Sequence, residues 1–299
     1  MLHFLPAPIK GSLGILVILL QTIILLPILL VFAFIKLLIP VPFVQRGCTI
    51  VLGSIATLWI GINNTLLNTL HRTEWEIHGL ETLSREEWYL VVSNHQSWAD
   101  IPILQYVFNR KIPLVKFFLK KQLIWVPLLG VAWWALDFPF MQRFTREQIA
   151  KRPELKGRDL ETTRKACEKF RYTPVTVLNF MEGTRFTPQK HARQSSEYQH
   201  LLKPRAGGTG FVLGAMGDII NTMLDVSIIY PAGVPTFWDF ICGKVRRIII
   251  DIRKVDIPFD FLGMDYTNDE ARRQAFQDWV AALWKQKDER IDELLNSAP

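Results

Sequence analysis

The sequence predicts an α/β domain, in which helices cover a mixed, mostly parallel sheet, preceded by a membrane hairpin of two helices. Three observations support this fold class: two long uncharged stretches, apolar runs of strand length separated by helical segments, and an amphipathic segment near the end of the chain. A chain of 299 residues has ample length for a buried core. We expect membrane-anchoring helices over residues 1–72 and a globular domain over residues 73–299.

The anchor is predicted from two stretches without any charge, residues 11–35 and 47–70, each long enough to cross roughly 30 Å of hydrocarbon as a helix. The first is too long for the apolar core of a cleavable signal peptide, so we expect it to be retained. The second carries Asn63, Asn64 and Asn68, and it could be a second span, a re-entrant segment or an interfacial helix. Basic residues flank both stretches and set no orientation; we favour a hairpin that returns the chain to its starting side.

The strands are predicted from five segments of the globular part. Residues 74–83 alternate apolar and charged side chains, which is typical of a half-buried strand. Residues 88–94, 175–180 and 225–230 are continuous apolar runs of the kind found in central strands, and residues 246–255 add another. Strands separated by helical segments indicate an α/β sheet with both faces covered.

The last helix has the clearest pattern. Asn268 can cap it, and Asp269 and Glu270 suit the positive end of its dipole. Its apolar residues recur at helical spacing and predict one stripe that docks on the core. They are Phe276, Trp279, Val280, Leu283 and Trp284.

Charge is concentrated in one part of the chain. The net charge is +7, whereas residues 110–171 hold 15 Lys/Arg against 6 Asp/Glu, a surplus of 9. This surplus suits an anionic membrane surface or anionic substrates, with a solvated basic face as the plain alternative. No recognition motif for nucleic acid accompanies it, and we expect no nucleic-acid partner.

Within this region, residues 122–136 are uncharged but short for a span; we expect core packing, with an acyl groove or insertion into the membrane interface as alternatives.

Several kinds of chemistry find no support in the sequence. The three cysteines, Cys48, Cys167 and Cys242, have no paired or metal-like spacing, which fits a reducing compartment and predicts no metal site. The phosphate loop of nucleotide-binding proteins, the H-E-x-x-H helix of zinc proteases and the G-x-S-x-G turn of serine hydrolases are all missing.

A histidine and an aspartate follow the apolar run of residues 88–94. In an open α/β sheet the carboxyl ends of the strands are where ligands bind, so His95 and Asp100 are placed for chemistry. A carboxylate that holds one imidazole nitrogen leaves the other as a base, and the nucleophile would then come from the substrate. The structural alternative is that Asp100 serves a helix start, since either Ser97 or Asp100 could begin the next helix.

A second polar cluster follows the run of residues 175–180. Here Glu182, Gly183, Thr184 and Arg185 follow one another, and glycine allows a tight turn while the guanidinium has a planar fork suited to phosphate. A surface arginine paired with the glutamate is the plain alternative. Because both clusters leave strands, we expect them to face one cleft.

The two clusters together resemble the PlsC-type glycerolipid acyltransferases. Residues 94–100, Asn-His-Gln-Ser-Trp-Ala-Asp, resemble the N-H-x-S-x-x-D block of that family, and residues 182–185 resemble its E-G-T-R block. Residues 120–130 and 201–208 resemble further blocks, and the N-terminal anchor agrees as well. The chain departs from the family at Met181, where proline is common, and in the later apolar block, which usually carries an earlier proline.

The resemblance implies an activity and roles for the residues. Members of the family move a fatty acyl group from a thioester, acyl-CoA or acyl carrier protein, to a hydroxyl of a lysophospholipid or glycerol phosphate, with no cofactor. In that scheme His95 deprotonates the hydroxyl and Asp100 orients and stabilises the histidine, while Arg185 and Arg143 contact the acceptor phosphate and Glu182 orders the loop. We therefore expect a 1-acylglycerol-3-phosphate acyltransferase on a phospholipid bilayer, in the inner membrane of a bacterium with the catalytic domain on the cytoplasmic side.

Three other functions stay open from the sequence. The acceptor could be another lysophospholipid, which would make the enzyme one of lipid remodelling. Water could replace the lipid hydroxyl, which would make it a thioester hydrolase, although such an enzyme has no need of a phosphate-binding E-G-T-R block. A silent membrane scaffold is the third, and the intact His95–Asp100 pair argues against it.

Overall fold

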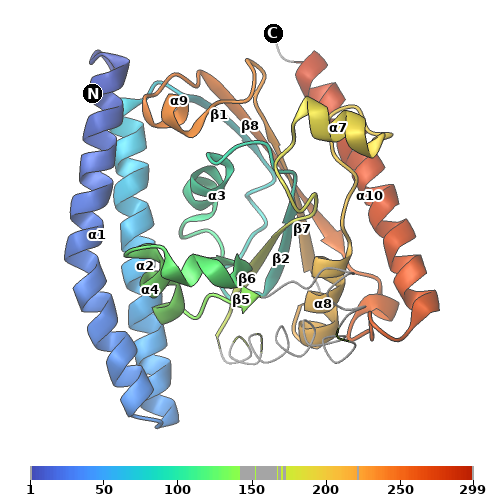
Figure 1. Cartoon of the computed structure of the whole chain (residues 1–299), viewed down its shortest axis with the longest axis horizontal. Coiled ribbons are helices and arrows are strands. Elements are labelled where there is room, and N and C mark those ends of the chain that lie inside the picture. The colour runs from blue at the N-terminus through green and yellow to red at the C-terminus, as the bar shows by residue number, and fades with distance from the viewer. Residues whose placement is uncertain are drawn as a thin grey trace.

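Two long helices begin the chain and lie side by side along one flank of the molecule (Figure 1). The computed structural model describes residues 2–141, 152, 167, 170, 173–220 and 222–297. Helix α1 (Ala7–Leu38) and helix α2 (Pro42–Leu70) form an antiparallel hairpin with a short turn between them. Both helices are long and apolar enough to cross a membrane, by length and composition.

The part after the hairpin is built on one six-stranded sheet with the strand order β1-β8-β7-β2-β6-β3. All neighbouring strands are parallel except β7 and β8. This confirms the predicted mixed, mostly parallel sheet. The strands are β1 (Glu74–His78), β2 (Tyr89–Ser93), β3 (Val115–Phe117), β6 (Thr176–Phe180), β7 (Thr222–Ile229) and β8 (Arg247–Asp256). A separate pair joins β4 (Leu119–Lys120) to β5 (Phe140–Met141).

Helices cover both faces of the sheet (Figure 1). The described helices after the hairpin are α3 (Asp100–Phe108), η1 (Lys121–Trp125), α4 (Leu129–Ala135), α7 (Pro188–Gln194), α8 (Gly207–Met216), α9 (Phe237–Ile241), η4 (Phe259–Phe261) and α10 (Glu270–Asn296). Because side chains alternate along a strand, β2 serves two cores. Leu90 and Val92 pack with α8 and α10, whereas Tyr89 and Val91 pack with α3 and α9.

The asparagines of α2 explain how the hairpin is attached. The Asn63 side chain pairs with Gln21 of α1, so it is satisfied inside the hairpin. Asn64 donates to the backbone oxygen of Tyr106 on α3 at 3.2 Å, and the Tyr106 hydroxyl donates to Asn68 at 2.8 Å. Helix α2 is therefore one continuous helix whose polar side docks on the domain, and most of the exposed large aliphatic side chains of the hairpin lie on α1.

The C-terminal helix begins one residue later than the sequence pattern suggested. Its N-cap is Asp269, whose side chain accepts a hydrogen bond from the backbone N–H of Arg272, so the prediction that Asn268 is the cap was wrong. The Asn268 side chain donates instead to Asp265. A carboxylate is a stronger acceptor for the free amides of a first turn. The predicted apolar stripe does dock on the core, with Phe276 and Trp284 fully buried.

Core packing was the wrong expectation for residues 122–136. These residues form η1 and α4 at the edge of the domain, and Trp125 is 85% exposed. A short apolar segment has the same sequence pattern whether it packs in a core or contacts a membrane. Only its position in the fold distinguishes these two possibilities.

Candidate active site

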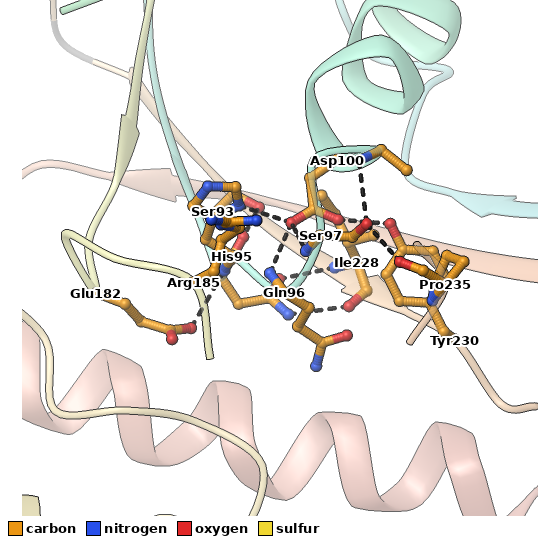
Figure 2. Close-up of polar contacts among 12 residues, drawn as sticks. Ser93, His95, Gln96, Ser97, Asp100, Glu182, Arg185, Ile228, Tyr230 and Pro235 are labelled. Atoms are coloured by element: carbon orange, nitrogen blue, oxygen red, sulfur yellow. Dashed lines mark hydrogen bonds and ion pairs between the residues drawn. The ribbon is translucent and has the colours of Figure 1, made fainter. Parts of the chain in front are cut away.

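Three neighbouring strands end together at the predicted site. β2 lies between β6 and β7, and both pairs are parallel, so their carboxyl ends share one edge of the sheet. His95 follows β2, Glu182 follows β6, and Tyr230 follows β7 directly. Figure 2 shows the side chains that these three ends bring together. The two clusters expected to face one cleft are thus on adjacent strands.

The aspartate is held in one position by several donors. His95 Nδ1 lies 2.7 Å from Asp100 Oδ2, and the same oxygen accepts from the backbone N–H groups of Gln96 at 2.6 Å and Ser97 at 2.9 Å. Asp100 is completely buried and begins helix α3. An ionised carboxylate is only an acceptor, so the imidazole must donate from Nδ1. The loop before α3 therefore determines the position of the carboxylate and, through it, of the ring.

The residue that follows strand β7, Tyr230, also holds the Asp100 carboxylate. The Tyr230 hydroxyl donates to Asp100 Oδ1 at 2.5 Å, and burial, together with the nearby Asp100 carboxylate, raises the pKa of Tyr230 well above its ordinary value. The phenol is therefore a permanent donor at any physiological pH. The Ser97 hydroxyl donates to the backbone oxygen of Pro235 at 2.7 Å, and Asn94 exchanges two hydrogen bonds with the backbone of Ile228.

The imidazole has one nitrogen left for chemistry. Its ring stacks on Phe180 at the end of β6, with 4.0 Å between the centroids and 15° between the planes. The His95 side chain is 14% exposed, and among the described residues no group is hydrogen-bonded to Nε2. With Nδ1–H directed at Asp100, Nε2 carries the lone pair. The arrangement can take a proton from a hydroxyl group that enters the site.

The second cluster is fastened to the first by backbone hydrogen bonds. The N–H of Met181 donates to the oxygen of Ser93 at 3.2 Å, and the N–H of Phe186 donates to the oxygen of His95 at 2.7 Å. Between them Gly183 turns with φ +66°, a left-handed conformation that glycine adopts without strain. A Cβ there would also lie 3.0 Å from Cδ of Arg205. The left-handed backbone favours glycine at the centre of the loop, and the close Arg205 side chain leaves little room for a larger residue.

The Glu182 side chain contacts the backbone of His95. It is completely buried, and its Oε1 accepts the backbone N–H of His95 at 3.2 Å. Burial raises the pKa of Glu182 to about 8, partly opposed by the backbone amides of His95 and Leu202 and by Lys287. Oε2 has no hydrogen-bond partner within the described part of the chain. A pKa raised to about 8 favours the neutral carboxyl at pH 7, and the carboxyl supports the backbone that carries the His95 imidazole.

Arg185 lies on the exposed side of the site. Its guanidinium lies over the Trp98 ring, 4.4 Å from the centroid. Lys190 of α7 donates to the Thr184 hydroxyl at 2.7 Å and to the backbone oxygen of Arg185 at 2.8 Å. Lys190 thus fixes the backbone of this loop. The half-buried guanidinium of Arg185 keeps N–H groups available for an anion. Arg143, the other predicted phosphate contact, lies outside the described residues.

Three residues of the site were missed from the sequence. Tyr230 directly follows strand β7, and the sequence gives no signal that its hydroxyl meets Asp100, which is 130 residues away. Arg205 lies in the segment of residues 201–208 that resembles a family block, but no role was attached to it; its backbone N–H donates to Met181 and its side chain covers Gly183. Trp98 sits inside the first motif at a position that the motif leaves variable.

Metal chemistry was not expected, and the described residues contain no group of three or more His, Cys, Asp or Glu side chains that could hold an ion. The cysteines Cys48, Cys167 and Cys242 are free and buried. Burial raises the pKa of Cys167 to about 12, so this thiol is unreactive.

An α/β sheet with a His–Asp pair at its strand ends, beside a loop that presents a guanidinium, defines a class of proteins equipped to activate a hydroxyl near an anionic group. Comparison with known proteins identifies the family. Residues 74–224 match the Acyltransferase family, and the chain belongs to this family. The similarity to PlsC-type glycerolipid acyltransferases predicted from the two motifs is confirmed.

Individual relatives are distant. An uncharacterized acyltransferase of Saccharomyces cerevisiae is 24% identical over 238 residues, which are 70% of this chain and 59% of that protein. The human 1-acyl-sn-glycerol-3-phosphate acyltransferase delta is 25% identical over 214 residues, 67% of this chain and 51% of that protein. This chain thus spans little more than half the length of these curated relatives.

A solved structure covers nearly the whole chain. The crystal structure of the 1-acyl-sn-glycerophosphate acyltransferase PlsC from Thermotoga maritima aligns with a TM-score of 0.51 and 17% identity. The alignment covers 93% of this chain and 98% of that one. At this identity the similarity establishes the fold.

Proposed function

We propose that this protein is a membrane-bound acyltransferase that moves a fatty acyl group from acyl-CoA or acyl carrier protein to the sn-2 hydroxyl of lysophosphatidic acid and so forms phosphatidic acid. The observation that carries the proposal is the His95–Asp100 pair, joined at 2.7 Å with Nε2 left unbonded among the described residues. Relatives that bear the name 1-acyl-sn-glycerol-3-phosphate acyltransferase support the choice of acceptor.

The reaction follows from the position of the base. Nε2 of His95 takes the proton of the acceptor hydroxyl as the oxygen attacks the thioester carbonyl carbon. The new C–O bond forms, the C–S bond breaks, and the thiolate takes the proton back from the imidazolium. Asp100 stays ionised throughout and stabilises the imidazolium that forms between the two transfers. No acyl-enzyme is needed, because the substrate itself supplies the nucleophile.

The acceptor phosphate is assigned to Arg185. A guanidinium that lies on Trp98 is oriented before the ligand arrives, and its fork can bond two phosphate oxygens at once. Arg143 remains a predicted second contact. The scheme uses no cofactor and no metal, since proton transfer and attack need only groups of the protein and the two substrates.

The membrane is the proposed location, because the lysophosphatidic acid acceptor and the phosphatidic acid product are lipids. The hairpin also has the length and composition of membrane helices. The inner membrane of a bacterium, with the domain on the cytoplasmic side, stays a prediction. The curated relatives described above come from yeast and human, and the solved structure comes from a bacterium.

A panel of acceptors tests the proposal. Purified full-length protein in lipid micelles is given one acyl-CoA and a series of lysophospholipids with different headgroups, and the products are identified by mass, with His95→Ala as control. We expect phosphatidic acid to form fastest. Preference for another headgroup would identify a remodelling enzyme, whereas free fatty acid without any phospholipid product would identify a thioester hydrolase.

A further inference from the structure

The segment formed by η1 and α4 exposes large apolar side chains close to the hairpin. Trp125 is 85% exposed, and its apolar neighbours are exposed by 39–45%. Together they make the η1–α4 surface: Trp125, Leu128, Leu129, Val131 and Trp134. We propose that this surface inserts into the bilayer as a second membrane contact, which holds the catalytic domain at a fixed tilt. The inference relies on the proposed function only for the membrane location.

The backbone is built to present this surface. Leu128 has φ +64° and ψ −53°, and the N–H of Leu129 donates to the oxygen of Pro127 at 2.7 Å. Such a three-residue turn is rare and strained for a residue other than glycine. Next to it, a Cβ on Gly130 would lie 2.0 Å from the backbone oxygen of Ile124, so α4 starts tightly against η1. The strained turn places Leu128 and Leu129 outward on a fixed base.

The η1–α4 surface continues the exposed face of the hairpin. Trp134 lines an open apolar groove together with Val31 and Phe34 of α1, and all three side chains are exposed. On the inner side, Ala135 packs with Ala33 of α1 and with Leu52 of α2. Figure 1 shows α4 lying across the lower half of the hairpin. Helix α4 is therefore fixed to α1, and a bilayer that meets the outer face of α1 meets α4 as well.

The composition favours lipid over a protein partner. Residues 119–136 contain no Asp or Glu, and Lys120 and Lys121 are exposed at the edge of the surface. Tryptophan side chains prefer the boundary between lipid and water, and flanking lysines favour anionic headgroups. An apolar patch with a basic edge, continuous with a helix of membrane composition, fits a bilayer.

An environment-sensitive label tests the depth of insertion. A Leu129→Cys variant of the full chain is labelled with a nitrobenzoxadiazole dye and reconstituted in vesicles of two parts phosphatidylcholine and one part phosphatidylglycerol. Phe259→Cys is the matched control, because Phe259 is 86% exposed on η4, which packs on α8 and α10 away from the hairpin. The unchanged chain, whose cysteines are buried, gives the background labelling.

The label at residue 129 should emit at shorter wavelength in vesicles, be quenched severalfold more by spin-labelled lipids than the label at residue 259, and resist iodide. Access of iodide to both labels, without quenching by the lipids, would overturn the proposal. So would protection from iodide without lipid quenching, because protein, for example a second copy, would then cover the surface.

Transfer rates give a second readout. Trp125→Ser/Leu129→Ser should lower acyl transfer to vesicle-borne acceptor severalfold and leave transfer to a dispersed short-chain acceptor unchanged, and Phe259→Ser should change neither. Equal rates for the double variant and the unchanged chain on vesicles would contradict the inference. If the unchanged chain transfers no acyl group to any acceptor, the proposed function fails, and the label experiment still decides the membrane contact.

Discussion

His95 is positioned by three contacts from the ends of strands β2 and β6, and each contact acts on a different part of the residue. Asp100 holds Nδ1, Phe180 supports the ring, and Glu182 accepts the backbone N–H. In the proposed mechanism, a base with so little freedom loses little entropy when the acceptor hydroxyl arrives. The residue-scale predictions concern these groups and the guanidinium of Arg185.

His95→Ala should lose roughly 10²–10⁴-fold in turnover, because an aliphatic alcohol does not ionise unaided and needs a positioned base. Asp100→Asn should be severe too, since it leaves the imidazole in the wrong tautomer and removes the charge that stabilises its protonated form. The losses should not add, because a carboxylate has nothing to orient once the base is gone. Steady-state kinetics of both single variants and the double variant check this. A double-variant loss equal to the product of the two single losses would show that the residues act independently.

Arg185→Ala should damage use of a phosphate-bearing acceptor more than use of the acyl donor. Charge-assisted hydrogen bonds contribute about 1.5–3 kcal/mol, which corresponds to a loss of roughly ten- to a hundredfold in kcat/KM for that acceptor. Arg185→Lys should recover little, since an ammonium cannot bond in two places at once or stack as well on Trp98. The comparison uses an acceptor without the phosphate; an equal loss there would assign Arg185 another role.

Glu182→Gln should change how stability depends on pH. The ordinary pKa of 4.5 is raised to about 8 by burial, so between these values only the folded state holds the proton. Stability contributed by Glu182 is full below pH 4.5 and falls as pH rises through about 8. Glutamine is neutral throughout, so the Tm of the variant minus that of the unchanged chain should increase between about pH 6 and about pH 9. A difference that stays constant with pH would mean that the buried carboxyl does not titrate in this range.

At the element scale, the hairpin is packed onto the domain along much of its length. Gly11 of α1 lies where a Cβ would be 2.6 Å from Sγ of Cys242, and further along α1 the side chain of Lys36 pairs with Asp137. On α2, the oxygen of Thr57 accepts from Asn109 at 3.4 Å. The domain lies beside the helices and not beyond their ends. One side of α1 therefore packs on protein, and its other side is exposed and, in the proposed location, would face lipid.

Gly11→Ala should destabilise the protein, because the added methyl group meets the Cys242 sulfur and the Trp238 ring. Overpacking of this kind costs about 1–3 kcal/mol, less the gain of up to about 1 kcal/mol from alanine in a helix. Gly53→Ala on α2 is the matched control, since nothing lies within 4 Å of its added Cβ, and it should be neutral or slightly stabilising. Thermal unfolding in micelles measures both. Equal shifts in Tm would show that α1 is not tightly docked at Gly11.

At the scale of the whole molecule, the proposed attachment to the membrane depends on the apolar surface area that the hairpin exposes. Exposed aliphatic side chains run along α1 from Ile9 to Leu38, and the ionic strength of the medium has little influence on such contacts. In the proposed function, this attachment would keep the site at the membrane surface, where a lipid acceptor would reside.

Full-length protein should therefore stay with membranes after washing with high salt and with alkaline carbonate. A chain without residues 1–72 should lose most of this attachment. The remainder would come from the η1–α4 surface and from basic side chains, and the basic contribution should weaken as ionic strength rises. Fractionation with immunodetection of both forms measures this. Release of most of the full-length chain by salt or carbonate would contradict the proposed anchor.

Much of this protein was determined by short-range features of the sequence. The buried strands, the two long apolar helices and the His95–Asp100 pair each depend on residues that are close in sequence, where the period of side chains and the geometry of one loop are enough. Asp100 follows His95 by five positions, and the loop between them also supplies the N–H groups of Gln96 and Ser97 that hold the carboxylate.

The tertiary structure alone decided the rest. Tyr230 reaches Asp100 from 130 residues away, and Glu182 reaches the His95 backbone from 87, because β2 lies between β7 and β6. Sequence patterns do not encode strand order directly, since it results from packing among distant segments. Burial behaves the same way: a sequence shows that Glu182 is acidic and Trp125 apolar, but whether protein covers a side chain depends on every element around it. That covering raises the pKa of the glutamate, and its absence leaves the tryptophan exposed at the surface beside the hairpin.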